Sequence, residues 1–179
     1  MFDASPKRVL DRILGVQTMT MKDLIEKLKN QKQPTDGRLI QRRDNYVKAV
    51  AQLIVDIQKW LEPAVRDNIM TLSVSTVDRT EEDIGTYPVQ ELTIRLVNRD
   101  GLIVKIEPIG AMIVGTVGSR RGRPVANLRG RVELSCGPMR LPFGLTDTGT
   151  WQAIPLQGEP REVDEQTFAE ILGEVLLDG

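Results

Sequence analysis

The chain has 179 residues, of which 40% are hydrophobic and 27% are charged, its net charge is −1, and it contains no histidine. A chain of this length fits one domain, or a domain with an appendage, and is large enough to fold without disulfides or a bound metal. Histidine is the usual general acid-base near neutral pH and the commonest metal ligand. Its absence excludes Ser-His-Asp and Cys-His catalysis and every zinc site that uses imidazole.

The cysteine content and the hydropathy bear on the location of the protein. The single cysteine, Cys136, cannot form a disulfide within the chain, which is usual in a reducing compartment. No segment approaches the ~20 apolar residues of a membrane helix, and the N-terminus lacks the apolar run of a signal peptide. We therefore expect a cytoplasmic protein with no membrane contact.

The first 37 residues predict two short helices and a linker. Ser5 and Pro6 form an N-cap and first-turn pair, and Gly15 ends the apolar stripe that follows. Thr20 begins a second short helix. Residues 30–37 are polar, include proline and glycine, and are typical of a linker.

The next segment predicts one long amphipathic helix over residues 38–61. Apolar residues recur at a spacing of seven, with complementary positions between them, and Pro63 is expected to end the helix. The apolar face comprises Ile40, Tyr46, Val47, Val50, Leu53, Ile54, Ile57, Trp60 and Leu61.

Two interpretations of this face stay open. In the first, the face packs on the sheet of its own chain. In the second, the sustained seven-residue spacing also pairs it with another copy or with a partner protein. Arg43 occupies one core position of the repeat, which counts against a simple coiled coil.

From Ile69 onward the hydrophobic period changes from 3.6 to 2, which predicts short β-strands. A loop over residues 78–88 and a tight turn over residues 98–101 separate the first three strands. Pro142 indicates an edge strand. The predicted strands cover residues 70–76, 92–96, 102–107, 111–117, 132–136, 139–145 and 151–154.

The last segment predicts an acidic amphipathic helix, with Asp164 as its N-cap and Phe168 on its apolar face. Short strands joined by tight turns imply an antiparallel meander of about seven strands, either a strongly twisted sheet or an open barrel. We therefore predict the α+β class, with an N-terminal helical arm over residues 1–62. Residues 63–179 then form a sheet domain closed by the C-terminal helix, and one continuous domain is the alternative.

Residues 118–131 form an arginine-rich segment in a chain of nearly balanced charge. Arg121-Gly122-Arg123-Pro124 resembles the core of an AT-hook, a short motif that binds the minor groove of DNA. The resemblance covers these four residues and implies that both arginines enter a narrow A·T groove. After them, Val125 stands where further basic residues are usual. The arginines of the segment are Arg120, Arg121, Arg123, Arg129 and Arg131.

Three interpretations of the arginine-rich segment stay open. It is the solvated tip of a hairpin, a contact to phosphates or to an acidic protein surface, or a true AT-hook. The last thirty residues hold one Lys or Arg against seven Asp or Glu, so an acidic partner for the segment also exists within the chain.

Candidates for chemistry are few. The cluster Glu81-Glu82-Asp83 offers the oxygen ligands that Mg²⁺ or Ca²⁺ prefers, but it lacks the spacing of a calcium loop. Cys136 has no activating base beside it and is typical of a structural thiol. We predict no catalytic residue, no cofactor and no metal site.

The sequence predicts a non-catalytic interaction subunit or adaptor, which assembles with itself or with a partner protein through its N-terminal helices. One alternative is a DNA-associated accessory protein that contacts the phosphate backbone or the minor groove through residues 118–131. A second alternative is a metal-dependent enzyme that uses carboxylates, because that chemistry needs no histidine.

Overall fold

The computed structural model describes residues 20–22, 25–26, 36–99, 101–112, 128–155 and 158–177. The chain forms two compact units, residues 1–35 and residues 36–179. In the first unit, residues 21–22 and 25–26 are helical, and the rest of the two predicted short helices lies outside the described residues.

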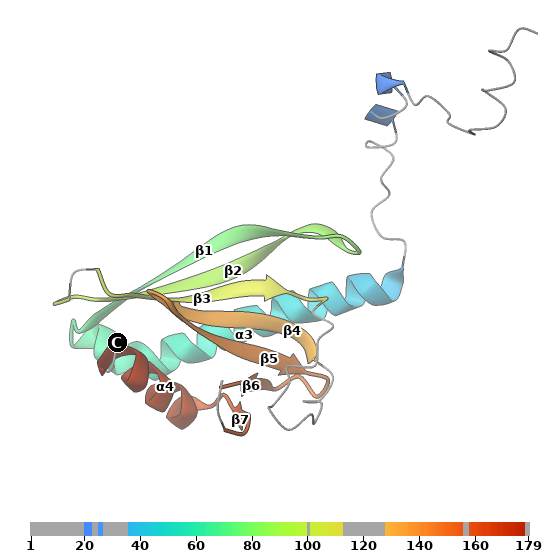
Figure 1. Cartoon of the computed structure of the whole chain (residues 1–179). Coiled ribbons are helices and arrows are strands. Elements are labelled where there is room, and N and C mark those ends of the chain that lie inside the picture. The colour runs from blue at the N-terminus through green and yellow to red at the C-terminus, as the bar shows by residue number, and fades with distance from the viewer. Residues whose placement is uncertain are drawn as a thin grey trace, which may run out of the picture. The chain divides into compact units, whose positions relative to one another are not determined.

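The second unit consists of one long helix, a seven-stranded antiparallel sheet and a C-terminal helix (Figure 1), which confirms the predicted α+β class. The sheet is open and its strands follow one another in chain order, so the topology is a simple meander. The elements are α3 (Gly37–Arg66), β1 (Met70–Glu81), β2 (Gly85–Leu96), β3 (Ile103–Gly110), β4 (Leu128–Cys136), β5 (Met139–Thr146), β6 (Trp151–Ala153), β7 (Arg161–Glu162) and α4 (Glu165–Leu177).

Helix α3 begins at an aspartate cap and runs further than the sequence predicted. The Asp36 carboxylate accepts a hydrogen bond from the Arg38 amide at 2.9 Å, which satisfies one of the free amides of the first turn. The expectation that Pro63 ends the helix is wrong, because the helix continues to Arg66 with Pro63 inside it. A proline so close to the C-terminus removes a single amide donor from the last turns, so the helix continues past it.

The first hairpin is longer than its sequence pattern indicated. β1 and β2 pair without interruption from Met70 opposite Leu96 to Glu81 opposite Gly85, so the predicted loop over residues 78–88 is wrong. Charged and polar side chains occupy the outer half of this hairpin because β2 pairs with β3 only over residues 92–95. Beyond that point β1 and β2 form a two-stranded ribbon that β3 does not extend.

The face of β2 that is buried changes along the length of the hairpin. Near β3 the buried hydrophobic residues of β2 are Leu92 and Ile94, whereas further out they are Val89 and Tyr87. Two-stranded ribbons twist more strongly than wider sheets, so the opposite face of the ribbon turns toward the core. The outer half of the hairpin therefore folds back over the end of β3.

Two further expectations about the strands need correction or fall outside the structure. Pro142 does not mark an edge strand, because β5 pairs with both β4 and β6. The pairing with β6 begins at Phe143, one residue later, so the missing amide of Pro142 interrupts no bond to β6. Of the predicted strand over residues 111–117, only Ala111 and Met112 are described, and neither belongs to a strand.

The core lies between the two helices and one face of the sheet. α3 crosses this face, and α4 lies beside the C-terminal half of α3 (Figure 1), where the rings of Trp60 and Phe168 are 5.6 Å apart. The predicted N-cap of α4 is confirmed, because the Asp164 carboxylate accepts a hydrogen bond from the Thr167 amide at 2.8 Å.

Helix α3 approaches the sheet closely at Tyr46 and Gly130. Tyr46 is completely buried, and its hydroxyl donates a hydrogen bond to the Arg131 carbonyl at 2.7 Å. A Cβ atom on Gly130 would lie 2.3 Å from Cδ2 of the Tyr46 ring, so only glycine allows this contact.

We predict that Gly130→Ala lowers the free energy of unfolding by about 1–3 kcal/mol, because the added methyl group would clash with the buried Tyr46 ring. Gly173→Ala is the matched control. It lies inside α4 with no atom within 4 Å of the added Cβ, and we expect it to stabilise the protein by up to about 1 kcal/mol. Urea denaturation of both variants measures the difference, and equal effects would contradict the proposed contact.

Candidate functional site

The predicted assembly face of α3 lies largely inside its own chain. Six of its nine residues are buried against the sheet and α4, so they are core residues that another molecule cannot also cover. The buried members are Tyr46, Val50, Leu53, Ile54, Ile57 and Leu61. The other three, Ile40, Val47 and Trp60, are half-buried.

The arginine-rich segment falls only partly within the described residues. Arg120, Arg121 and Arg123 lie outside them. Arg129 is exposed near the start of β4, whereas the Arg131 guanidinium forms an ion pair with Glu133 at 2.6 Å. Of the two described arginines of this segment, Arg131 is therefore paired, whereas Arg129 has no carboxylate at ion-pair distance among the described residues.

Arg129 lies at a cleft of about 400 Å³ between the first half of α3, the start of β4 and the turn that joins β5 to β6. Arg42 and Lys48 of α3 also line the cleft, and Asp147 is its one acidic residue. Amide and hydroxyl groups of Asn45, Thr146 and Thr148 add to the polar lining, and the buried side chains of Tyr46 and Leu145 lie at its base. We call this feature the basic cleft.

Arg42 is fixed in the basic cleft by the backbone. Its Nη2 donates a hydrogen bond to the Leu128 carbonyl at 3.1 Å, while its Nε is shielded from solvent and has no hydrogen-bond partner. Burial lowers the pKa of the Arg42 guanidinium, the nearby charge of Arg129 lowers it further, and Glu81 acts in the opposite direction. Arginine stays charged in proteins, so two positive charges face one cleft.

A second polar group fastens the tip of the first hairpin to the end of β3. The Glu81 carboxylate accepts hydrogen bonds from the amides of Ala111 and Met112, each at 2.8 Å, and from the Tyr87 hydroxyl. The metal interpretation of Glu81-Glu82-Asp83 loses its first ligand here, because Glu81 points into the chain while Glu82 and Asp83 are exposed.

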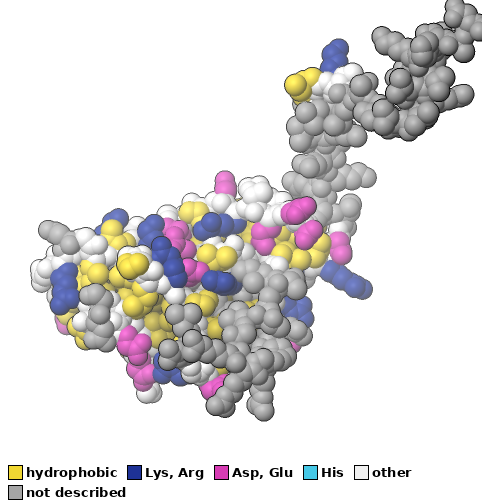
Figure 2. All heavy atoms as spheres, in the orientation of Figure 1, with side chains coloured by type: hydrophobic (Ala, Val, Ile, Leu, Met, Phe, Trp, Pro, Cys, Tyr) yellow, Lys and Arg dark blue, Asp and Glu magenta, His cyan; other side chains and the backbone are white. Residues whose placement is uncertain are grey.

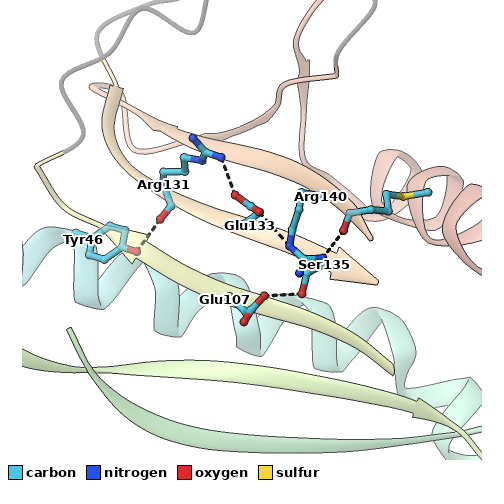
Figure 3. Close-up of polar contacts among 7 residues, drawn as sticks. Tyr46, Glu107, Arg131, Glu133, Ser135 and Arg140 are labelled. Atoms are coloured by element: carbon cyan, nitrogen blue, oxygen red, sulfur yellow. Dashed lines mark hydrogen bonds and ion pairs between the residues drawn. The ribbon is translucent and has the colours of Figure 1, made fainter. Parts of the chain in front are cut away.

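The face of the sheet away from the helices carries paired charges. Ser135 donates a hydrogen bond to Glu107 at 2.5 Å, and Glu133 lies between Arg131 and Arg140 (Figure 3). Figure 2 shows side chains of both charges next to one another among hydrophobic side chains over the sheet. The charges of Arg131, Glu133 and Arg140 therefore pair within the chain.

Residues for metal or thiol chemistry do not gather anywhere in the part of the chain that the structure describes. No three Asp, Glu or Cys side chains there are placed to hold a metal ion. Cys136 is a free, buried thiol at the end of β4, packed in the core cluster.

Sequence reasoning missed the basic cleft. Arg42 and Lys48 look like ordinary solvent-facing charges of an amphipathic helix, and no local pattern connects them to Arg129, some eighty residues later. The nearest sequence signal is the run of Thr146, Asp147, Thr148 and Gly149, which is typical of a polar turn but gives no partner.

Comparisons with known proteins give no family for this chain: no family model, no curated protein and no solved structure matches it. Within the described ranges, no helix combines the length and the hydropathy required to cross a membrane.

Both tyrosines of the chain, Tyr46 and Tyr87, should resist ionisation in the folded protein. Burial raises the pKa of each phenol above its usual value near 10, and Glu81 raises both further, through a hydrogen bond in the case of Tyr87. Below about pH 10 both phenols are protonated in the folded and unfolded states, so their ionisation does not affect the free energy of unfolding there. Above it, the unfolded chain releases protons that the folded chain retains, so stability falls as the pH rises. We expect ultraviolet absorbance to detect no tyrosinate near pH 10 until the protein unfolds, whereas a step in the native protein would contradict this burial.

We predict that Glu81→Gln destabilises the protein by about 1–3 kcal/mol, because an amide nitrogen cannot accept the hydrogen bonds that the second carboxylate oxygen accepts. Glu82→Gln removes the same charge from an exposed neighbour and should change stability by less than about 0.5 kcal/mol. Thermal or urea unfolding measures both, and equal effects would show that Glu81 has no special role.

Proposed function

We propose that this protein is a non-catalytic subunit that assembles with a second copy of itself, and that the contact is the free edge of β1. This keeps the function expected from the sequence and assigns it to a different surface. The observation that supports it is a long edge strand at one side of an open sheet (Figure 1), whose first eight residues carry no charge.

The edge of β1 lacks the usual protection of edge strands. Proteins normally shield such edges with charged residues, proline, bulges or short length, because unpaired backbone groups bind other strands. β1 has twelve residues, pairs with β2 without a bulge, and carries neither charge nor proline from Met70 to Val77. Residues 73–76 are all exposed. Such an edge favours pairing with another strand.

A second copy fits this edge because the strand is complementary to itself. An antiparallel pairing centred on Ser73 places Leu72 opposite Val74 and Thr71 opposite Ser75 of the other copy. Facing residues lie on the same side of the joined sheet, and no charge opposes a like charge over residues 70–76. Two-fold dimers are the commonest assemblies and need one self-complementary patch of this kind.

Apolar side chains beside the start of β1 extend this surface. Ile69 directly precedes the strand and is 49% exposed, and its carbonyl accepts a hydrogen bond from the amide of Val97. Val97 and Val65, four residues before Ile69, are also exposed. Burial of these side chains at the ends of the paired strands would add hydrophobic stabilisation to the backbone hydrogen bonds.

A cytoplasmic location is part of this proposal. Cys136 is a free thiol in the core cluster, as expected of a protein that folds under reducing conditions. No disulfide is needed to hold a sheet whose strands each pair with their neighbours in the chain.

We predict that Val74→Lys dissociates the dimer, because a charge in the middle of β1 is the device by which natural edge strands prevent pairing. Light scattering or sedimentation should give a dimer mass for the full chain and a monomer mass for the variant. Its far-ultraviolet circular dichroism should not change, since Val74 is 39% exposed.

Ile109→Lys is the matched control. Ile109 is also 39% exposed but lies on β3, inside the sheet, so the same substitution there should leave the dimer intact. A monomeric full chain at all concentrations, or an unchanged mass for Val74→Lys, would overturn the proposal.

A further inference from the structure

We propose that the basic cleft binds a phosphate group, with Arg42, Lys48 and Arg129 as its cationic ligands. This site is separate from the edge of β1 and does not depend on assembly.

The three cations come from elements that the fold holds together. Arg42 and Lys48 lie in the first half of α3, and Arg129 is the second residue of β4. The bond from Arg42 Nη2 to the Leu128 carbonyl links the helix directly to the residue before Arg129. The three cations therefore come from a helix and a strand, which position side chains more firmly than loops do.

Positive charge exceeds negative charge in the basic cleft, where Asp147 is the one acidic residue of the lining. Among the described residues, no carboxylate forms an ion pair with any of the three cations. Most other arginines of the sheet and of α3, including Arg43, Arg66, Arg131 and Arg140, have a carboxylate within 4 Å. Like charges raise each other's energy, and an anion between them removes that cost.

The polar lining favours phosphate over a simple carboxylate. A phosphate carries up to two charges and three acceptor oxygens, which need several donors in different directions. The Arg42 guanidinium lines the cleft, and Asn45 and Thr148 contribute amide and hydroxyl groups there. Guanidinium groups match phosphate geometry with paired N–H donors. A volume of about 400 Å³ is within the range of small-ligand sites.

The phosphate could belong to a free small molecule or to the backbone of a nucleic acid, which would connect the cleft to the role expected for residues 118–131. Two probes distinguish these sources. Pyrophosphate represents the free ligand, and a fluorescein-labelled DNA duplex represents the backbone. The full chain is used for both.

Thermal unfolding and calorimetric titration test the first source. A ligand that binds only the folded protein raises the unfolding midpoint, so pyrophosphate should raise it for the wild type. Lys48→Gln combined with Arg129→Gln should abolish the shift, with a loss of affinity of roughly ten- to hundredfold for each charged hydrogen bond removed. Both side chains are exposed, so the fold should persist, as circular dichroism can verify.

Lys59→Gln combined with Arg66→Gln is the matched control. It removes the same charge from two exposed positions of α3 that do not line the cleft, so pyrophosphate should still bind. Equal losses in both double variants would mean that binding follows net charge, which would overturn the proposal.

A salt series with the duplex tests the second source. Duplex binding that pyrophosphate displaces, with a salt dependence that weakens in the cleft variant, supports the proposal and assigns the phosphate to a nucleic acid. Pyrophosphate binding without duplex binding supports it and assigns a free ligand. The proposal is wrong if neither probe binds, or if the cleft variant binds both as the wild type does.

Discussion

The contact between Tyr46 and Gly130 determines how the long helix lies on the sheet. The ring occupies the space that a side chain at residue 130 would fill, and its hydroxyl bonds the next carbonyl along β4. The ring also meets Tyr87 and Trp151 edge-on, each with centroids 6.5 Å apart, so one residue joins α3, β2, β4 and β6. Arg42 lies one turn before Tyr46 on the same side of the helix, which brings it to the Leu128 carbonyl. The basic cleft therefore follows from how this aromatic group is packed.

Glu81 has a comparable role at the other end of the first hairpin. The twist of the ribbon turns Tyr87 toward the core, and the carboxylate of Glu81 joins this hydroxyl to two backbone amides after β3. Those amides follow the last residue of a strand and would otherwise lack a partner within the sheet. Glu81, which the sequence suggests is a solvent-exposed residue, thus links the first hairpin to the end of β3.

The sequence predicted most of the architecture because local patterns determine it. The stripe from Tyr46 to Leu61, the glycine turn at Gly101 and the cap at Asp164 each need only neighbouring residues to be recognised. The errors arose where tertiary packing overrides local preference, as in the outer half of the first hairpin, whose polar residues pair as strands. The helix face was correctly identified as apolar, and of its two interpretations the burial of six residues in the core supports packing on the sheet of the same chain. The cleft was missed because it depends on which side of α3 meets β4.

The meander order of the strands has a consequence for how the chain acquires its structure. Each strand pairs with the one made just before it, and α3 precedes them all, so the sheet can lengthen strand by strand as synthesis proceeds. Pairing between sequence neighbours keeps the entropic cost of loop closure low at every step. The docking of α4 against Trp60 joins segments about a hundred residues apart, and it comes last because α4 is the last element of the chain. Until α4 docks, the apolar surface around Trp60 stays accessible on the nascent chain. A chaperone that binds exposed apolar surface would therefore bind the chain most strongly at this stage.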